Sequence, residues 1–193
     1  LDMAECGAGS RTLAALQRAF AAGARLQLLS LAGNTAVSDA DAAALGGALA
    51  AAAAAAEGSA EGPLVHLELS GTQAGPQAVA ALSQASGLRH LSLVGCPLGA
   101  AGAAALATSL AAGGWAGLQE LCVSGTGLGS QDVDAIFSAL AGAGAPGLKS
   151  LEIGANPATQ DDDFVGRLDA LRAARPDMAV YWRSGDDPAP VVR

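Results

Sequence analysis

One nine-residue pattern recurs five times along this chain of 193 residues and limits the folds that it can adopt. The pattern has an aliphatic residue at its first, fourth and sixth positions and Asn, Cys or Thr at its ninth. Its copies read LQLLSLAGN at 26–34, LVHLELSGT at 64–72, LRHLSLVGC at 88–96, LQELCVSGT at 118–126 and LKSLEIGAN at 148–156. Leucines at the fourth position lie 24 to 38 residues apart, which leaves room for a helix between copies. The pattern therefore predicts an array of strand–helix units.

The intervals between the copies predict the helices. Each interval carries apolar residues at helical spacing: Leu13, Leu16 and Phe20; Leu45 and Leu49; Val79 and Leu82; Leu106 and Leu110; Val133, Ile136, Phe137 and Leu140; Phe164, Val165, Leu168 and Leu171. Ser10 and Ser130 are the expected N-caps of two of these helices, and Pro76 fits the first turn of a third. Because a returning helix follows each strand, neighbouring strands are expected to pair in parallel.

These repeats resemble those of the leucine-rich repeat family, in its ribonuclease-inhibitor-like class with long α/β repeats. The resemblance implies an α/β solenoid in the shape of a horseshoe arc, with a parallel inner sheet and outer helices. It covers residues 1–182, about six strand–helix units. The residue that ends each strand motif is expected to turn inward and bond the backbone of the bend. This turn ladder comprises Cys6, Asn34, Thr72, Cys96, Thr126 and Asn156.

The two ends of the array differ. LDMAECGAG at 1–9 aligns with LSLVGCPLG at 91–99, so the numbering begins inside a repeat. A solenoid needs its apolar end covered, and we expect upstream repeats or a partner to cover this one. At the other end MAVYW, residues 178–182, is expected to form a last strand, with Tyr181 and Trp182 over the core. Residues 183–193 are polar and contain proline, which predicts a flexible C-terminal extension.

Side chains between the motif leucines are expected to face solvent on the concave side of the sheet, in two rows. One row comprises Leu28, His66, His90, Glu120 and Ser150, and the other Asp2, Ser30, Glu68, Ser92, Cys122 and Glu152. We predict that a partner binds this face through His66, Glu68, Arg89, His90, Glu120, Cys122 and Glu152.

Other chemistry on this face is conceivable but less favoured. Two histidines beside Glu68 could form a two-His, one-carboxylate metal site, yet an open sheet supplies no closed pocket around it. The glutamates could act as paired catalytic carboxylates. An open face does not exclude water, however, so nothing there would shift their pKa values usefully. We therefore predict no catalytic residue, no metal and no cofactor. Trp115 is more plausible as a plug over the end of a helix than as an interface anchor.

The composition limits the kinds of partner that the chain can bind. The net charge is -8, there is no run of Lys and Arg, and aromatic residues make up 3% of the chain, all of which argue against nucleic acid. The longest apolar run, 42–56, contains Gly46 and Gly47 and is too short to cross a bilayer as a helix, so no membrane insertion is expected. Three cysteines, with Cys6 and Cys96 at turn positions, predict free thiols and a cytoplasmic location.

These features predict a non-catalytic module that binds another protein through the concave sheet and adjoining loops. The alternative is a structural subunit of a large assembly, such as a ciliary, axonemal or cytoskeletal complex. A third hypothesis is a GTPase-activating protein of the kind that acts on Ran, which looks similar in repeat type. That family uses a loop arginine, and the loops after Asn34, Thr72, Cys96 and Thr126 contain none.

Overall fold

A computed structural model describes residues 1–55, 63–142 and 144–183. Within these residues, six strands form one parallel sheet in which their spatial order is their order along the chain. They are β1 (Leu26–Ser30), β2 (Leu64–Glu68), β3 (His90–Ser92), β4 (Glu120–Cys122), β5 (Ser150–Glu152) and β6 (Ala179–Tyr181). The helices are α1 (Ser10–Ala21), α2 (Asp39–Ala55), α3 (Pro76–Leu82), α4 (Gly99–Ala111), α5 (Ser130–Ala141) and α6 (Phe164–Ala174), and η1 (Pro157–Gln160) is a 3-10 turn.

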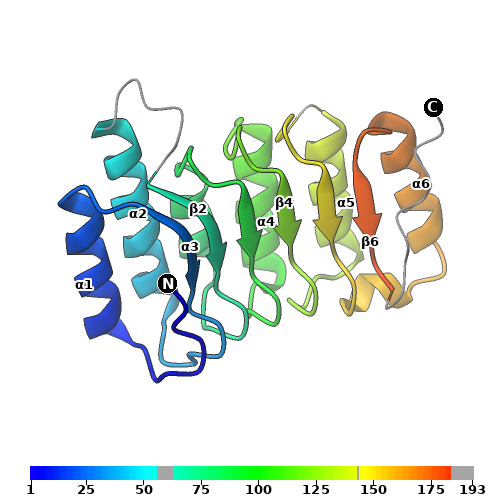
Figure 1. Ribbon diagram of the computed structural model, residues 1–193. Coiled ribbons are helices and arrows are strands. Elements are labelled where there is room, and N and C mark those ends of the chain that lie inside the picture. The colour runs from blue at the N-terminus through cyan, green and yellow to red at the C-terminus, as the bar shows by residue number, and fades with distance from the viewer. Residues whose placement is uncertain (56–62, 143, 184–193) are drawn as a thin grey trace.

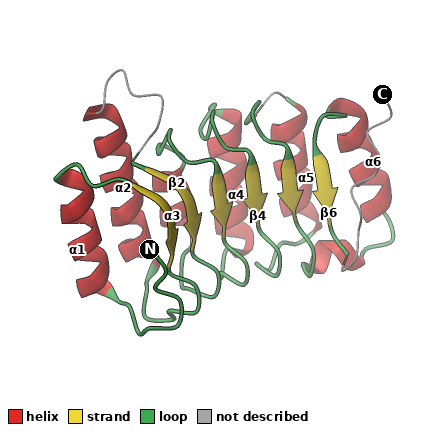
Figure 2. Cartoon of the chain, viewed as in Figure 1, coloured by secondary structure: helices red, strands yellow, loops and turns green. Residues whose placement is uncertain are grey.

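The helices gather on one side of the sheet and leave its other side open, in an α/β arrangement of two layers (Figures 1 and 2). Consecutive helices pack side by side, as consecutive strands do. This one-sided layout follows from the repeat, because every unit sends its chain back along the same face.

The core lies between the sheet and the helices. The fourth-position leucines are at most 2% exposed, as expected for Leu29, Leu67, Leu91, Leu121 and Leu151. Each helix turns its apolar stripe toward them, with one exception. Val165 was expected in the stripe of the last helix, but it is 44% exposed. The prediction that Val165 is buried is wrong because this residue directly follows the buried Phe164, and adjacent helical residues point about 100° apart.

Strand pairing aligns equivalent residues of successive repeats in the two predicted rows. Ser30 was expected to face solvent but is 5% exposed, because Asp2 and Glu68 lie beside it on either side. Leu28, His66, His90, Glu120 and Ser150 are paired in turn, as are Ser30, Glu68, Ser92, Cys122 and Glu152. Asp2 extends the second row through a parallel bridge to Ser30. We call the surface formed by these two rows the open face.

Buried side chains bond the bends after the strands. Asn156 donates from Nδ2 to the carbonyls of Val123 (2.9 Å) and Ile153 (2.8 Å), and its Oδ1 accepts from the amide of Thr126 (2.9 Å). Thr72 Oγ1 donates to the carbonyl of Leu69 at 2.7 Å. Such bonds satisfy buried backbone groups within one bend and join it to its neighbour.

Cys6 departs from this ladder. It was predicted at a buried turn position, but it is exposed. The side-chain amide of Asn34 bonds this first bend instead, since its Oδ1 accepts from the amide of Ala8 at 2.7 Å and its Nδ2 donates to the carbonyl of Met3 at 2.8 Å. The first bend is thus bonded by the next repeat and not by the side chain at position 6.

The predicted serine caps are also wrong. The N-cap residues of α1 and α5 are Gly9 and Gly129, and the serines are the first helical residues. Their hydroxyls instead reach carboxylates of the following repeat. Ser10 Oγ donates to Asp41 Oδ2 at 3.0 Å, and Ser130 Oγ donates to Asp161 Oδ2.

At the C-terminal end the predicted last strand is present as β6. Trp182 packs on Phe164 with ring centroids 4.9 Å apart, so it covers the core as expected. Tyr181 does not, because strand alternation places it in register with Glu152 on the open face. Of the predicted extension, Arg183 lies over the Trp182 ring and residues 184–193 are outside the described part. At the opposite end Leu1 is 53% exposed.

Candidate functional site

A shallow hollow of about 550 Å³ opens on the open face between β2 and β5. Six of the seven residues predicted to bind a partner line it, namely His66, Glu68, His90, Glu120, Cys122 and Glu152. The rest of its lining comprises the serines Ser70, Ser92 and Ser150 and the aliphatic residues Leu91, Val94 and Leu121. Ser92 and Ser150 are the small residues of the two rows at this place, and they leave space beside the larger histidine and glutamate side chains.

Each carboxylate in the hollow is bonded to a side chain of the preceding strand. Ser30 Oγ donates to Glu68 Oε2 at 3.0 Å, and Cys122 Sγ donates to Glu152 Oε2 at 3.0 Å. His90 Nδ1 lies 2.9 Å from Glu120 Oε2. The parallel register produces this pattern, because it sets a donor of one strand beside an acceptor of the next. The sequence placed Ser30, Ser92 and Ser150 in the two rows but assigned them no role, and it did not indicate Ser70, since serine on a strand carries no signal of its own.

The two histidines stack on each other. Their ring centroids are 5.2 Å apart and their planes differ by 16°. A metal ion lies in the plane of each imidazole that binds it, about 2 Å from the nitrogen. Nearly parallel rings at this separation point their nitrogens side by side, so His66 and His90 do not converge on one ion. In residues 1–55, 63–142 and 144–183, no group of three or more His, Cys, Asp and Glu is arranged to hold a metal.

The Cys122 thiol is a hydrogen-bond donor at neutral pH. Burial and the bond to the Glu152 carboxylate raise the pKa of Cys122 to about 11. A thiol with that pKa remains protonated at neutral pH, which makes it a poor nucleophile and metal ligand.

Arg89, the seventh predicted residue, does not line the hollow. Its Nη1 donates to the carbonyl of Gly117 at 2.9 Å. The Arg89 side chain therefore bonds the loop that precedes β4. Gly117 is suited to this contact, since a Cβ there would lie 1.6 Å from the Arg89 Nη1.

Trp115 is buried, with 2% of its surface exposed. Its backbone has a left-handed φ of 55°, and its amide donates to the carbonyl of Ser83 at 3.0 Å. Burial excludes an anchor on the free surface, and the role of Trp115 as a plug over the end of the preceding helix stays a prediction.

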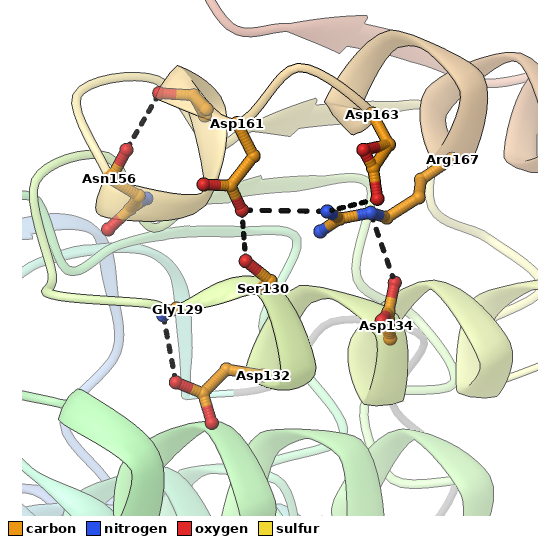
Figure 3. A network of polar contacts seen from close by, with 9 residues as sticks. Gly129, Ser130, Asp132, Asp134, Asn156, Asp161, Asp163 and Arg167 are labelled. Carbon is orange, nitrogen blue, oxygen red and sulfur yellow. Dashed lines mark hydrogen bonds and ion pairs between the residues drawn. The ribbon is translucent and has the colours of Figure 1, made fainter.

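A second polar cluster joins α5 to the last repeat on the helical side (Figure 3). Arg167 on α6 lies 3.7 Å from Asp134 on α5, 3.5 Å from Asp161 and 3.3 Å from Asp163. Its guanidinium therefore fixes the turn between η1 and α6 against the neighbouring helix. The run of three aspartates was visible in the sequence, but nothing there indicated that an arginine would gather them.

Comparisons with known proteins do not assign a family. No protein-family model and no curated protein matches the chain. Among solved structures, actin-binding site 2 of leiomodin-1 gives a TM-score of 0.49 at 11% sequence identity, over 86% of this chain and 75% of that one. A likeness at this level carries no conclusion about function. Across the described residues, no helix combines the length and apolar character needed to span a membrane.

Proposed function

We propose that this chain is a leucine-rich repeat solenoid and a non-catalytic module that binds another protein through its open face and the adjoining loops. The recurring motif, the parallel strand order and the inward Asn and Thr side chains support the repeat class. The three cysteines are free, which supports a reducing location such as the cytoplasm.

The observation that carries the binding proposal is the hollow itself. Its polar side chains come from four consecutive strands and are fixed by bonds between strands, so little conformational entropy is lost when a partner orders them. It is open to water, and the Cys122 thiol is protonated, so the arrangement suits recognition better than acid–base or nucleophilic chemistry.

Affinity capture with quantitative mass spectrometry tests this proposal. Partners of the native protein are compared with those of a variant in which His66, Glu68, His90 and Glu120 are all changed to Ala. A matched control changes four exposed residues on the helical side, Arg11, Arg18, Asp162 and Asp169, to Ala.

We expect one stoichiometric partner that the open-face variant loses and the control keeps. A large complex that survives the open-face changes would contradict the proposal. It would favour a structural subunit held by its ends or helices.

A further inference from the structure

We infer that the partner presents two cationic side chains about 14 Å apart, on an extended segment that crosses the strands of the open face. This inference rests on the proposed function and specifies the chemistry of its partner. The occupant is a stretch of protein chain with lysine or arginine at two positions and small residues between them.

The charges of the hollow favour cationic groups on the partner. Glu68 lies toward one end, Glu120 and Glu152 lie toward the other, and the lining includes no Lys or Arg within the described chain. The Glu120 side chain is 59% exposed. The bonds to Ser30, His90 and Cys122 all engage the Oε2 atoms, so among the described residues Oε1 of each carboxylate is left for a partner.

The register sets the distance between the two anionic points. Glu68 and Glu152 belong to the same row and are separated by three strand-to-strand steps. At about 4.8 Å per step this is about 14 Å. Ser92 and Cys122 lie between them in that row, so a segment with small central residues can rest on the hollow.

An extended chain matches this distance. Its residues advance about 3.3 Å each and alternate sides, so side chains at i and i+4 point the same way about 13 Å apart. Basic residues at i and i+4 therefore reach Glu68 at one end and Glu120 with Glu152 at the other. Charge complementarity selects this occupant over an apolar one.

Two isomeric peptides test the spacing. Arg-Thr-Ser-Thr-Arg and Arg-Arg-Thr-Ser-Thr, both with blocked ends, have equal charge and composition and differ only in arginine spacing. Each is titrated into ¹⁵N-labelled protein at low salt, and amide shifts of β2 to β5 report binding. We expect the spaced peptide to bind about two- to fivefold more tightly, since one additional exposed ion pair contributes that much.

Single charge removals show where the preference arises. Glu68→Gln should abolish it by weakening only the spaced peptide, whereas Asp162→Asn, on the helical side, should leave it unchanged. Equal affinity of the isomers, a preference that survives Glu68→Gln, or no shifts at millimolar peptide would overturn the inference. Loss of the captured partner in the open-face variant would still support the proposed function, so the two failures are distinguishable.

Discussion

Asn156 joins two repeats through one buried side-chain amide. Its Oδ1 accepts from the amides of Thr126 and Leu128, and its Nδ2 donates to the carbonyls of Val123 and Ile153. Thr72 satisfies fewer backbone groups, since its hydroxyl donates to the carbonyl of Leu69 and accepts from the amide of Ala74. The bends are thus stabilised to different degrees, according to how many backbone groups each side chain satisfies.

Asn156→Ala should therefore destabilise the protein by about 2–4 kcal/mol, because several buried backbone groups lose their partners together. Thr72→Val keeps the shape and removes fewer bonds, so we expect about 1–2 kcal/mol. Urea unfolding followed by circular dichroism measures both. A cost below that of Thr72→Val for the Asn156 variant would contradict this role.

Thiol reactivity tests the contact between β4 and β5. With a pKa of about 11, only about one in a thousand Cys122 thiols is ionised at pH 8. Exposed Cys6 should therefore react with iodoacetamide well before Cys122. Because the Glu152 carboxylate contributes to raising this pKa, Glu152→Gln should speed labelling of Cys122 and leave that of Cys6 unchanged. Peptide mass spectrometry after timed quenching measures the rates, and unaltered Cys122 labelling would argue against the contact.

Helices α2 and α3 approach closely at Gly46. A Cβ at that position would lie 2.8 Å from the amide nitrogen of Leu82 and 3.0 Å from the carbonyl carbon of Ala81. These are backbone atoms, which cannot swing aside as a side-chain end does. Gly47, the next residue, is exposed, and a Cβ there would meet no atom within 4 Å. The alanine-rich helix thus contains one glycine required by packing beside one that is not.

Adjacent substitutions should therefore act in opposite directions. Gly46→Ala should cost about 1–3 kcal/mol through the forced shift of α3. Gly47→Ala should gain about 0.5–1 kcal/mol through higher helix propensity. Thermal unfolding of both variants measures the difference. Stabilisation by Gly46→Ala would mean that the two helices are farther apart than described.

Most of the architecture could be predicted because it depends on local pattern. Leucine spacing fixes the buried side of each strand, and the register then follows from repeat to repeat, which is how the two rows could be predicted. Cys6 and the two serines could not be placed, because their surroundings are set by Asn34 and by carboxylates of the following repeat. The prediction that Arg89 lies on the binding face was wrong for the same reason, since its bond to Gly117 is a contact between repeats.

The residues that line the hollow were largely predicted from the sequence, but their geometry was not. Alternation indicated which side chains would face solvent, and six of the seven named residues line the hollow. The stacking of His66 on His90 and the donor from each preceding strand depend on rotamers, which no pattern in the sequence encodes.

Amide hydrogen exchange of the captured complex tests most directly whether the open face binds the partner. The free protein and the complex are compared, with exchange resolved to peptides that cover the strands and the helices. We predict protection confined to peptides containing β2 to β5 and the loops that follow these strands, with α1 to α6 unchanged. Protection on the helices alone, with the strand peptides exchanging as in the free protein, would contradict the account.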